Sequence, residues 1–336
     1  MAPVVLGLVL LIVGIAILTV AADHFVEGAA AIATARQISP VVVGALIIGF
    51  GTSLPEMLVS GVAAAQGDPE LGVGNVVGSN VANLSLVLGF AALIAVISCS
   101  ATTIRRELPM SVASVVLFAV LVQNGFTRIE GFILLAAMVA VLANLLSHSH
   151  DGIADLDEFH DEPVGKSAVR TVLGLAGTVG GAWLLVEGAL GVADSLGLSG
   201  GFVGLTMVAI GTSLPELVTA VVAARKGETG LIIGNLLGSN IFNSLAVGAV
   251  LGLVGPGPLD DDKLTGIATY IMLGVVVLAA LFLLTGGKVV RWQAAVLLMA
   301  YFAAMPFTAS TEIDCDSLSE GDTSSECIEA VASTGD

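Results

Sequence analysis

The chain has 336 residues, of which 56% are hydrophobic and only 12% are charged, and its mean hydropathy is +1.01. Soluble globular domains carry about 25% charged residues, so this composition excludes an ordinary soluble protein and indicates an integral membrane protein. The formal net charge of −17 is concentrated in 151–163 and in the segment from Ala309 onwards, and neither piece is apolar enough to bury a core.

Apolar segments of about 20 residues, the length that a helix needs to cross the bilayer core, recur along the chain. The first and sixth segments are unusually long, so we expect strongly tilted helices there. The first segment lacks the basic residues that open a signal peptide, and we interpret it as a spanning helix. We therefore expect an all-α polytopic membrane protein with ten transmembrane helices, at 4–34, 39–66, 70–98, 107–124, 127–148, 167–195, 199–225, 229–254, 264–285 and 289–308.

The eleven basic residues predict how these helices are oriented. Loops on the cytoplasmic side are enriched in Lys and Arg. If the N-terminus is outside, nine of the eleven fall in inner loops, and only Arg128 and Lys263 fall in outer ones. We therefore expect both termini to be extracellular, in a protein of the cell membrane.

An internal repeat relates the two halves of the chain with an offset of 160 residues. Gly51–Asn83 aligns with Gly211–Asn243 without a gap, and 17 of these 33 positions are identical. Five predicted helices precede the second copy, so the two copies enter the membrane from opposite sides. Such inverted repeats place a transporter's substrate site near the bilayer midplane. The expected parts are a first transmembrane repeat at 1–148, an acidic cytoplasmic loop at 149–166, a second transmembrane repeat at 167–308 and an acidic, disordered extracellular tail at 309–336.

The six residues GTSLPE occur in both copies, at Gly51–Glu56 and Gly211–Glu216, each time inside an apolar segment. The proline has no N–H and its ring clashes with the carbonyl four residues earlier, so the helix must kink or break there. Freed carbonyls in hydrocarbon are tolerated where they line a cavity or bind an ion. A lone acid at the centre of a span costs about 3 kcal/mol and is a functional residue by default. If the turn stays near-helical, the Thr and Ser before each Glu face the same side as its carboxylate.

A second motif follows each copy of the first: GNVVGSNVAN at 74–83 and GNLLGSNIFN at 234–243. Its Ser and last Asn lie at i and i+4, on one face of a helix. Together the two halves offer two carboxylates, two amides, six hydroxyls and freed carbonyls, with no His or Cys nearby. An all-oxygen set suits a hard cation such as Ca²⁺ better than zinc or copper. We expect Asn80 and Asn240 to support packing or helix-end hydrogen bonds rather than to bind the ion.

With these motifs the chain resembles the prokaryotic sodium/calcium exchangers of the cation/calcium antiporter superfamily, whose two alpha-repeats carry GTSLPE and GSNxxN signatures. Both signatures are present twice, within 49–89 and 209–249, and the ten-helix layout spans residues 4–308. The resemblance implies that helices two, three, seven and eight surround one calcium site flanked by sodium sites. Helices one and six would slide across this core to alternate access.

The resemblance also implies a role for each matching position. The expected central calcium ligands are Glu56 and Glu216. The hydroxyls beside them are expected at Thr52, Ser53, Thr212 and Ser213, with backbone oxygens near Gly49 and Ala209, further hydroxyls at Ser79 and Ser239, and amides at Asn83 and Asn243. Ca²⁺ and Na⁺ are substrates in this interpretation. We expect no cofactor, no nucleic acid and no obligate protein partner besides the lipid bilayer.

The residue Asn243 bears on the coupling. Some relatives, including the potassium-dependent ones, carry an Asp there, so we expect transport that does not require potassium. With two glutamates the local charge is −2, which one Ca²⁺ neutralises and three Na⁺ exceed by one. We therefore expect electrogenic exchange of about three Na⁺ for one Ca²⁺.

Three other functions fit the sequence less well. A proton/calcium antiporter shares the fold, and the two glutamates could themselves take up protons, so this alternative stays open. A cation channel would need a continuous pore and usually several subunits. An enzyme has the least support, because the sequence shows no nucleophile–base pair, and GVGNVVG lacks the strand-to-helix context of a dinucleotide site.

Several polar residues outside the motifs are weighed as well. Glu27 and Glu187, at matched positions of the repeat, either guide ions at a vestibule or face solvent at the interface. The remaining polar groups are expected to have no site role: Asp23, His24 and Asp194 at the interface, and His148, His150 and His160 around the acidic loop. Cys99, Cys315 and Cys327 form no metal-ligand spacing, and the last two either pair or stay free.

Overall fold

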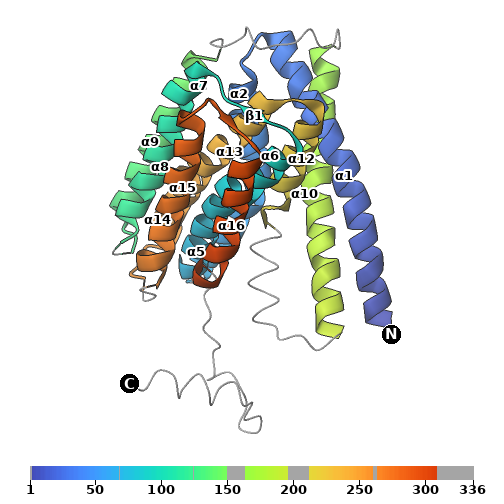
Figure 1. Ribbon diagram of the computed structural model, residues 1–336. Helices are drawn as coiled ribbons and strands as arrows, with labels where there is room; N and C mark the ends of the chain where they lie inside the picture. Colours follow the sequence, from blue (N-terminus) through green and yellow to red (C-terminus); the bar gives the residue numbers. More distant parts are fainter. Residues whose placement is uncertain are drawn as a thin grey trace.

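The computed structural model describes residues 2–67, 69–123, 125–149, 163–195, 212–259 and 263–308, which are almost entirely helical (Figure 1). The helices are α1 (Ala2–Arg36), α2 (Pro40–Val43), α3 (Phe50–Thr52), α4 (Leu54–Gln66), α5 (Pro69–Ala82), α6 (Leu88–Ile94), α7 (Ala101–Arg105), α8 (Glu107–Leu121), α9 (Arg128–Ser147), α10 (Val164–Ser195), α12 (Leu214–Lys226), α13 (Thr229–Ile241), α14 (Gly248–Val254), α15 (Thr269–Leu284) and α16 (Arg291–Thr308). Four π-helical segments continue or precede them: η1 (Gly44–Gly49), η2 (Asn83–Val87), η4 (Phe242–Val247) and η5 (Leu264–Ala268).

Six helical segments within the described residues are long and apolar enough to cross a membrane, and a bent pair forms a seventh span. The six are Val4–Arg36, Pro69–Ile94, Arg128–Ser147, Val164–Gly188, Thr229–Val254 and Leu264–Leu284. The chain is therefore a mostly helical, multi-pass membrane protein, as predicted. Helices α8, α12 and α16 lie on three further predicted spans, so the total of ten stays a prediction.

The bent pair is the first GTSLPE segment. Pro40–Thr52 and Leu54–Gln66 meet at an angle of 45°. Ser53, between them, has φ −83° and ψ 4°, and Ser213 has nearly the same conformation, φ −87° and ψ 3°, directly before α12. In both places the proline is the second residue of the new helix, where its missing N–H costs no hydrogen bond. The break that the proline predicts is therefore confirmed at the first motif, and the second motif starts its helix in the same way.

The two segments that follow the motifs form the centre of the molecule. In Pro69–Ile94 and Thr229–Val254, 78% of the most apolar window is buried, against 17% to 39% in the other four spans. The α13 helix packs on α2 and η1 through glycines: a Cβ added at Gly234 would overlap the backbone oxygen of Val41. This close approach brings the second half against the start of the first motif.

Helices α1 and α10 form a separate pair along one side of the molecule (Figure 1). They are the first and sixth predicted spans, and their lengths of 35 and 32 residues confirm that both are unusually long. Gly174 of α10 lies so close to α1 that an added Cβ would come within 2.5 Å of the Phe25 nitrogen. The pair contacts the central helices through α12, α2 and η1.

Contacts between loops define two ends of the bundle. At one end, strands β1 (Ile97–Ser98) and β2 (Lys288–Val289) pair antiparallel. At the other, the Phe126 and Gly257 backbones exchange two hydrogen bonds of 2.9 Å. Each contact joins loops that the predicted topology puts on one side. The expected helix limits at 98 and 289 are wrong, because these residues form the two strands instead.

Several sequence expectations lie outside the described residues. They concern the backbone oxygens expected near Ala209 and Gly211, the acidic loop with His150 and His160, and the side chain of Asp194. The tail with Cys315 and Cys327 also lies outside the described residues.

Candidate ion-binding site

Glu56 and Glu216 each lie in the first turn of a helix, three positions after the serine at the break. The positive end of the helix dipole favours an anion there. Their exposed fractions are 1% and 0%. The proline thus begins a new helix in the middle of a span and places its carboxylate at that helix's positive end.

Each carboxylate lies beside hydroxyls of the opposite half. Ser53 Oγ donates to Glu216 Oε1 over 3.4 Å, and Thr52 lies beside the same carboxylate. Glu56 lies beside Thr212 and also beside Ser79, and its charge interacts with that of Glu216. The near-helical arrangement considered from sequence differs from this geometry, because the break at Ser53 turns the first motif's hydroxyls toward the second half's carboxylate.

Most oxygens of the two carboxylates have no hydrogen bond. Both oxygens of Glu56, one of Glu216 (Oε2) and Ser213 Oγ are buried without a partner in the described part of the chain. No described lysine or arginine forms an ion pair with either glutamate. A buried carboxylate without a cation or a donor is costly, so these oxygens fit a hard cation held between them.

The backbone oxygen of Gly49 joins the two halves next to this pair. It accepts from Ser53 N over 3.1 Å and from Ser239 Oγ over 3.3 Å. A Cβ at Gly49 would come within 3.0 Å of Asn235 O on α13, so the contact needs a residue without a side chain. The structure thus brings together two of the predicted sodium-site positions, Gly49 and Ser239.

The predicted amides lie at the start of π-helical segments. Asn83 opens η2 and Asn243 is the second residue of η4, and single π-turns of this kind are frequent at functional sites. Asn83 Nδ2 donates to Asn240 Oδ1 over 3.1 Å, which leaves Asn83 Oδ1 buried without a partner. Both polar atoms of Asn243 are also buried without one among the described residues. Asn80 donates to Ser244 Oγ over 3.0 Å.

Sequence reasoning missed Asn75 and Asn235. Asn75 Nδ2 donates to the Glu56 carbonyl over 3.2 Å, and its Oδ1 accepts from Thr212 Oγ1 over 3.5 Å. Asn235 Oδ1 accepts from Thr52 Oγ1 over 3.3 Å. The sequence did contain a signal for them. Asn75 and Asn235 are identical residues at the 160-residue offset, and each is the second residue of the motif that begins with Gly-Asn.

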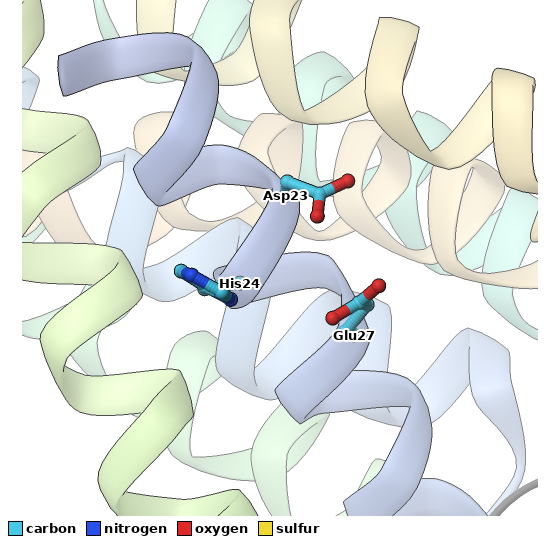
Figure 2. A group of neighbouring side chains, drawn as sticks. All are labelled: Asp23, His24 and Glu27. Carbon is cyan, nitrogen blue, oxygen red and sulfur yellow. The ribbon is translucent and has the colours of Figure 1, made fainter.

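The interfacial acids of α1 are held by basic residues. Asp23 and Glu27 point to one side of α1, and His24 points to another (Figure 2). Lys226 Nζ lies 2.8 Å from Asp23 Oδ1 and 2.7 Å from Glu27 Oε1, and Arg170 lies 2.8 Å from Glu27 Oε2. The three α1 side chains are close enough to hold a metal ion, but the two carboxylates already have cationic partners. The vestibule role considered for Glu27 stays untested.

Cys99 lies outside the spans, on a cavity of about 570 Å³ that neither glutamate lines. Burial, and then the nearby carboxylate of Glu107, raise the pKa of the Cys99 thiol to about 12. The thiol is therefore protonated at neutral pH, whereas metal ions bind the thiolate.

Comparisons with known proteins identify the family of this chain. The family model described as "Sodium/calcium exchanger protein" matches residues 6–164 and 166–309. A relative from Alkalimonas amylolytica, named as a candidate antiporter, CaxA, is 38% identical over 305 residues, which are 87% of this chain and 95% of the relative. The sodium/calcium exchanger MaX1 of Methanosarcina acetivorans is 30% identical, over 89% of this chain and 97% of the relative. A solved structure of the sodium-calcium exchanger NCX_Mj is 32% identical with a TM-score of 0.80, and the match covers 90% of this chain and 98% of that one.

Proposed function

Because the chain belongs to the family of sodium/calcium exchanger proteins, we propose that it exchanges Na⁺ for Ca²⁺ across the cell membrane at the site of Glu56 and Glu216. The observation that carries the proposal is the set of buried oxygens without partners. Three carboxylate oxygens and the Asn83 and Asn243 amide oxygens come from both halves and have no hydrogen bond within the described residues. Such a set suits hard cations.

Antiport follows if calcium and sodium compete for the same two carboxylates. Two unneutralised carboxylates are too costly to bury in a closed site, so the empty protein cannot readily change the side to which the site opens. Either kind of cation removes this obstacle. Each crossing is then made with ions bound, which couples the movement of one ion to the return of the other.

The α1 and α10 pair is the element that we expect to move. It forms a unit of two long helices that pack mainly on each other, and among the described residues it contacts the central helices through α12, α2, α3 and η1. Sliding this pair across the site would open it first to one side and then to the other, with both termini of the chain extracellular.

A second candidate function is exchange of H⁺ for Ca²⁺. The specific observation in its favour is that the two buried carboxylates face each other without a cationic side chain in the described part of the chain, so protons would neutralise them as cations do. The coupling ion is the point on which the two candidates differ.

The deciding experiment measures radioactive calcium uptake into proteoliposomes that are loaded with sodium and diluted into sodium-free buffer. Potassium-loaded and acid-loaded vesicles serve as controls, with the membrane potential clamped. We expect uptake only with sodium inside, and no effect of potassium. Uptake driven by an acid interior alone would identify the proton exchanger and contradict sodium coupling.

A further inference from the structure

Two buried asparagines contact the motif threonines from matched positions of the repeat. Asn75 on α5 is 9% exposed and Asn235 on α13 is 1% exposed. We propose that they are positioning residues: each accepts the proton of the threonine hydroxyl in the opposite half, so that the threonine oxygen presents lone pairs to the transported cation. This inference rests on the proposed function, because it assigns a role beside the same site.

The orientation of the Asn75 amide follows from its partners. Its Nδ2 lies 3.2 Å from the backbone oxygen of Glu56 and 3.0 Å from Ser60 Oγ. A carbonyl oxygen can only accept, so the atom that faces Glu56 must be the NH₂ group. The other end of the amide is therefore its oxygen, and it faces Thr212 Oγ1 at 3.5 Å. In this contact the threonine has to be the donor.

The same reasoning fixes Asn235. Thr219 Oγ1 donates its one proton to backbone oxygens, with Pro215 O at 2.7 Å and Glu216 O at 3.0 Å. It can therefore only accept from Asn235 Nδ2, which lies 3.5 Å away. Asn235 Oδ1 then faces Thr52 Oγ1 at 3.3 Å and Ser239 Oγ at 3.4 Å, and it can only accept from them. Each hydroxyl has one proton, which it shares between this amide oxygen and a backbone oxygen, Ile48 O at 2.9 Å for Thr52 and Gly49 O at 3.3 Å for Ser239.

This direction of donation matters for cation binding. A hydroxyl has one proton and two lone pairs, and a hydroxyl that binds a cation must give its proton to another acceptor. Without Asn75 Oδ1, the Thr212 hydroxyl would have the neighbouring Glu56 carboxylate as an acceptor, in competition with the ion. Thr52 also faces Ile48 O at 2.9 Å, which is closer than Asn235 Oδ1, so we expect its hydroxyl to depend only partly on its asparagine.

Each asparagine also connects the two halves. Asn75 holds the turn that carries Glu56 and, through Thr212, the start of the opposite motif. Asn235 connects Thr52 of the first motif to Thr219, one turn from Glu216. The two amides thus set the spacing of carboxylate and hydroxyl across the site, and neither needs to touch the ion.

The test is a double-mutant cycle on calcium binding, measured by calorimetry with Ca²⁺ alone in sodium-free buffer. Its variants are Asn75→Ala, Thr212→Val and the two combined. We expect each single change to weaken binding about tenfold, as the loss of one hydrogen bond does. In the Thr212→Val background, Asn75→Ala should weaken binding less than it does in the wild type, because only its contact with the Glu56 turn is left to lose. Thr212→Ser keeps the hydroxyl and should remain sensitive to Asn75→Ala.

The matched control is Gln293→Ala, which removes a similarly buried amide of α16 that accepts from Val290 N instead of contacting a motif residue. It should leave calcium binding unchanged. A combined variant weaker by the product of the single effects, about a hundredfold, would overturn the inference. Binding by Asn75→Ala that matches the wild type would also overturn it.

Two further arms keep the result decisive. If Asn75→Ala does not fold, the cycle of Asn235→Ala with Thr52→Val tests the matched position. A smaller coupling is expected there, because Thr52 also has Ile48 O as an acceptor, and fully additive effects would overturn the inference. Sodium-driven calcium uptake by the wild type is measured in parallel. If the wild type binds calcium but shows no sodium-driven uptake, the proposed coupling is contradicted. The double-mutant cycle on calcium binding still tests the role of the asparagines in that case.

Discussion

The carboxylates of Glu56 and Glu216 are buried at the positive ends of two helices, and three of their four oxygens have no hydrogen bond within the described residues. We predict that Glu56→Gln or Glu216→Gln lowers exchange at least about a hundredfold, because one carboxylate cannot neutralise a divalent cation. The fold should persist, since an amide of the same shape replaces a costly buried charge.

Calcium at a hundred times its Kd should stabilise the wild type by about 2.7 kcal/mol and the Gln variants far less. Thermal unfolding with and without calcium measures this.

A matched control for this prediction is Glu107→Gln. Glu107 is 2% exposed, so it is buried as deeply, but it forms an ion pair with Arg106 outside the motifs. This change should lower stability while calcium still stabilises the protein and transport continues. Normal transport by either motif variant would contradict the site assignment.

Cys99 gives a prediction on pH. Only the thiolate reacts with maleimide, and a pKa raised to about 12 leaves little thiolate at pH 7. In a Cys315→Ser, Cys327→Ser background, the labelling rate of Cys99 should rise about tenfold per pH unit through pH 10, whereas an ordinary thiol with a pKa of about 8.5 levels off. Rates measured at pH 7, 8, 9 and 10 decide, with detergent-unfolded protein as the reference. A plateau at pH 9 would contradict the environment described for this thiol.

At the scale of elements, the sequence predicts the helix break but not the direction in which the motif hydroxyls point after it. A proline after Ser53 in an apolar run requires a break, and the observed 45° bend agrees with it. The direction in which the hydroxyls then point depends on the packing of α13 on η1, which connects residues about 190 positions apart. The π-helical turns at Asn83 and Phe242 likewise have no local signature, because they depend on the helices packed around them.

The glycine contact between α13 and α2 gives a prediction for Gly234→Ala. The new Cβ would overlap the backbone oxygen of Val41, and backbone cannot move aside without separating the two helices. We expect a loss of about 1–3 kcal/mol of stability together with impaired transport. The control is Gly61→Ala, where the nearest described atom is Val250 Cγ1 at 3.4 Å. It should be neutral or stabilise α4 by about 0.5–1 kcal/mol. Equal melting temperatures for the two variants would contradict the packing argument.

The ion pairs of Lys226 connect the α1 and α10 pair to α12. Exposed pairs contribute about 0.2–1 kcal/mol each, so losing both pairs in Lys226→Gln should change the turnover rate by up to about thirtyfold with little effect on calcium affinity. High salt should reduce the difference, because it screens the pairs. Arg225→Gln removes the same charge from a neighbour for which no ion pair is found in the described ranges. Identical kinetics for these two variants would show that the pairs do not restrain α1.

For the whole molecule, most of the candidate site residues were predicted from the internal repeat. The offset of 160 residues identified both glutamates and the serines and amides that follow them, because a duplicated motif in an apolar run stands out from ordinary packing residues. Asn75 and Asn235 were equally visible in the alignment. Their role was not, since it depends on contacts between the halves that an alignment of each half with the other does not contain.

The charge of the ion-loaded site predicts which step of the exchange cycle depends on the membrane potential. With two glutamates and Asn243, the calcium-loaded site is neutral and a site with three Na⁺ carries +1. With the proposed exchange of three Na⁺ for one Ca²⁺, each turnover that brings Ca²⁺ in moves one positive charge out, so we expect an inside-positive potential to accelerate uptake. The calcium concentration ratio reached at equilibrium should change about tenfold per 60 mV, because one charge crossing 100 mV is worth about 2.3 kcal/mol.

The variant Asn243→Asp distinguishes the step of the exchange cycle that carries calcium from the step that carries sodium. A third ionised carboxylate would make the sodium-loaded site neutral and the calcium-loaded site −1, while the net charge moved per turnover stays the same. Calcium-for-calcium exchange without sodium should therefore ignore voltage in the wild type and respond to it in Asn243→Asp. Both can be measured in potential-clamped proteoliposomes. Sodium-driven uptake that ignores voltage would mean two Na⁺ per Ca²⁺, and voltage-sensitive calcium exchange in the wild type would mean that two carboxylates do not set the charge of the site.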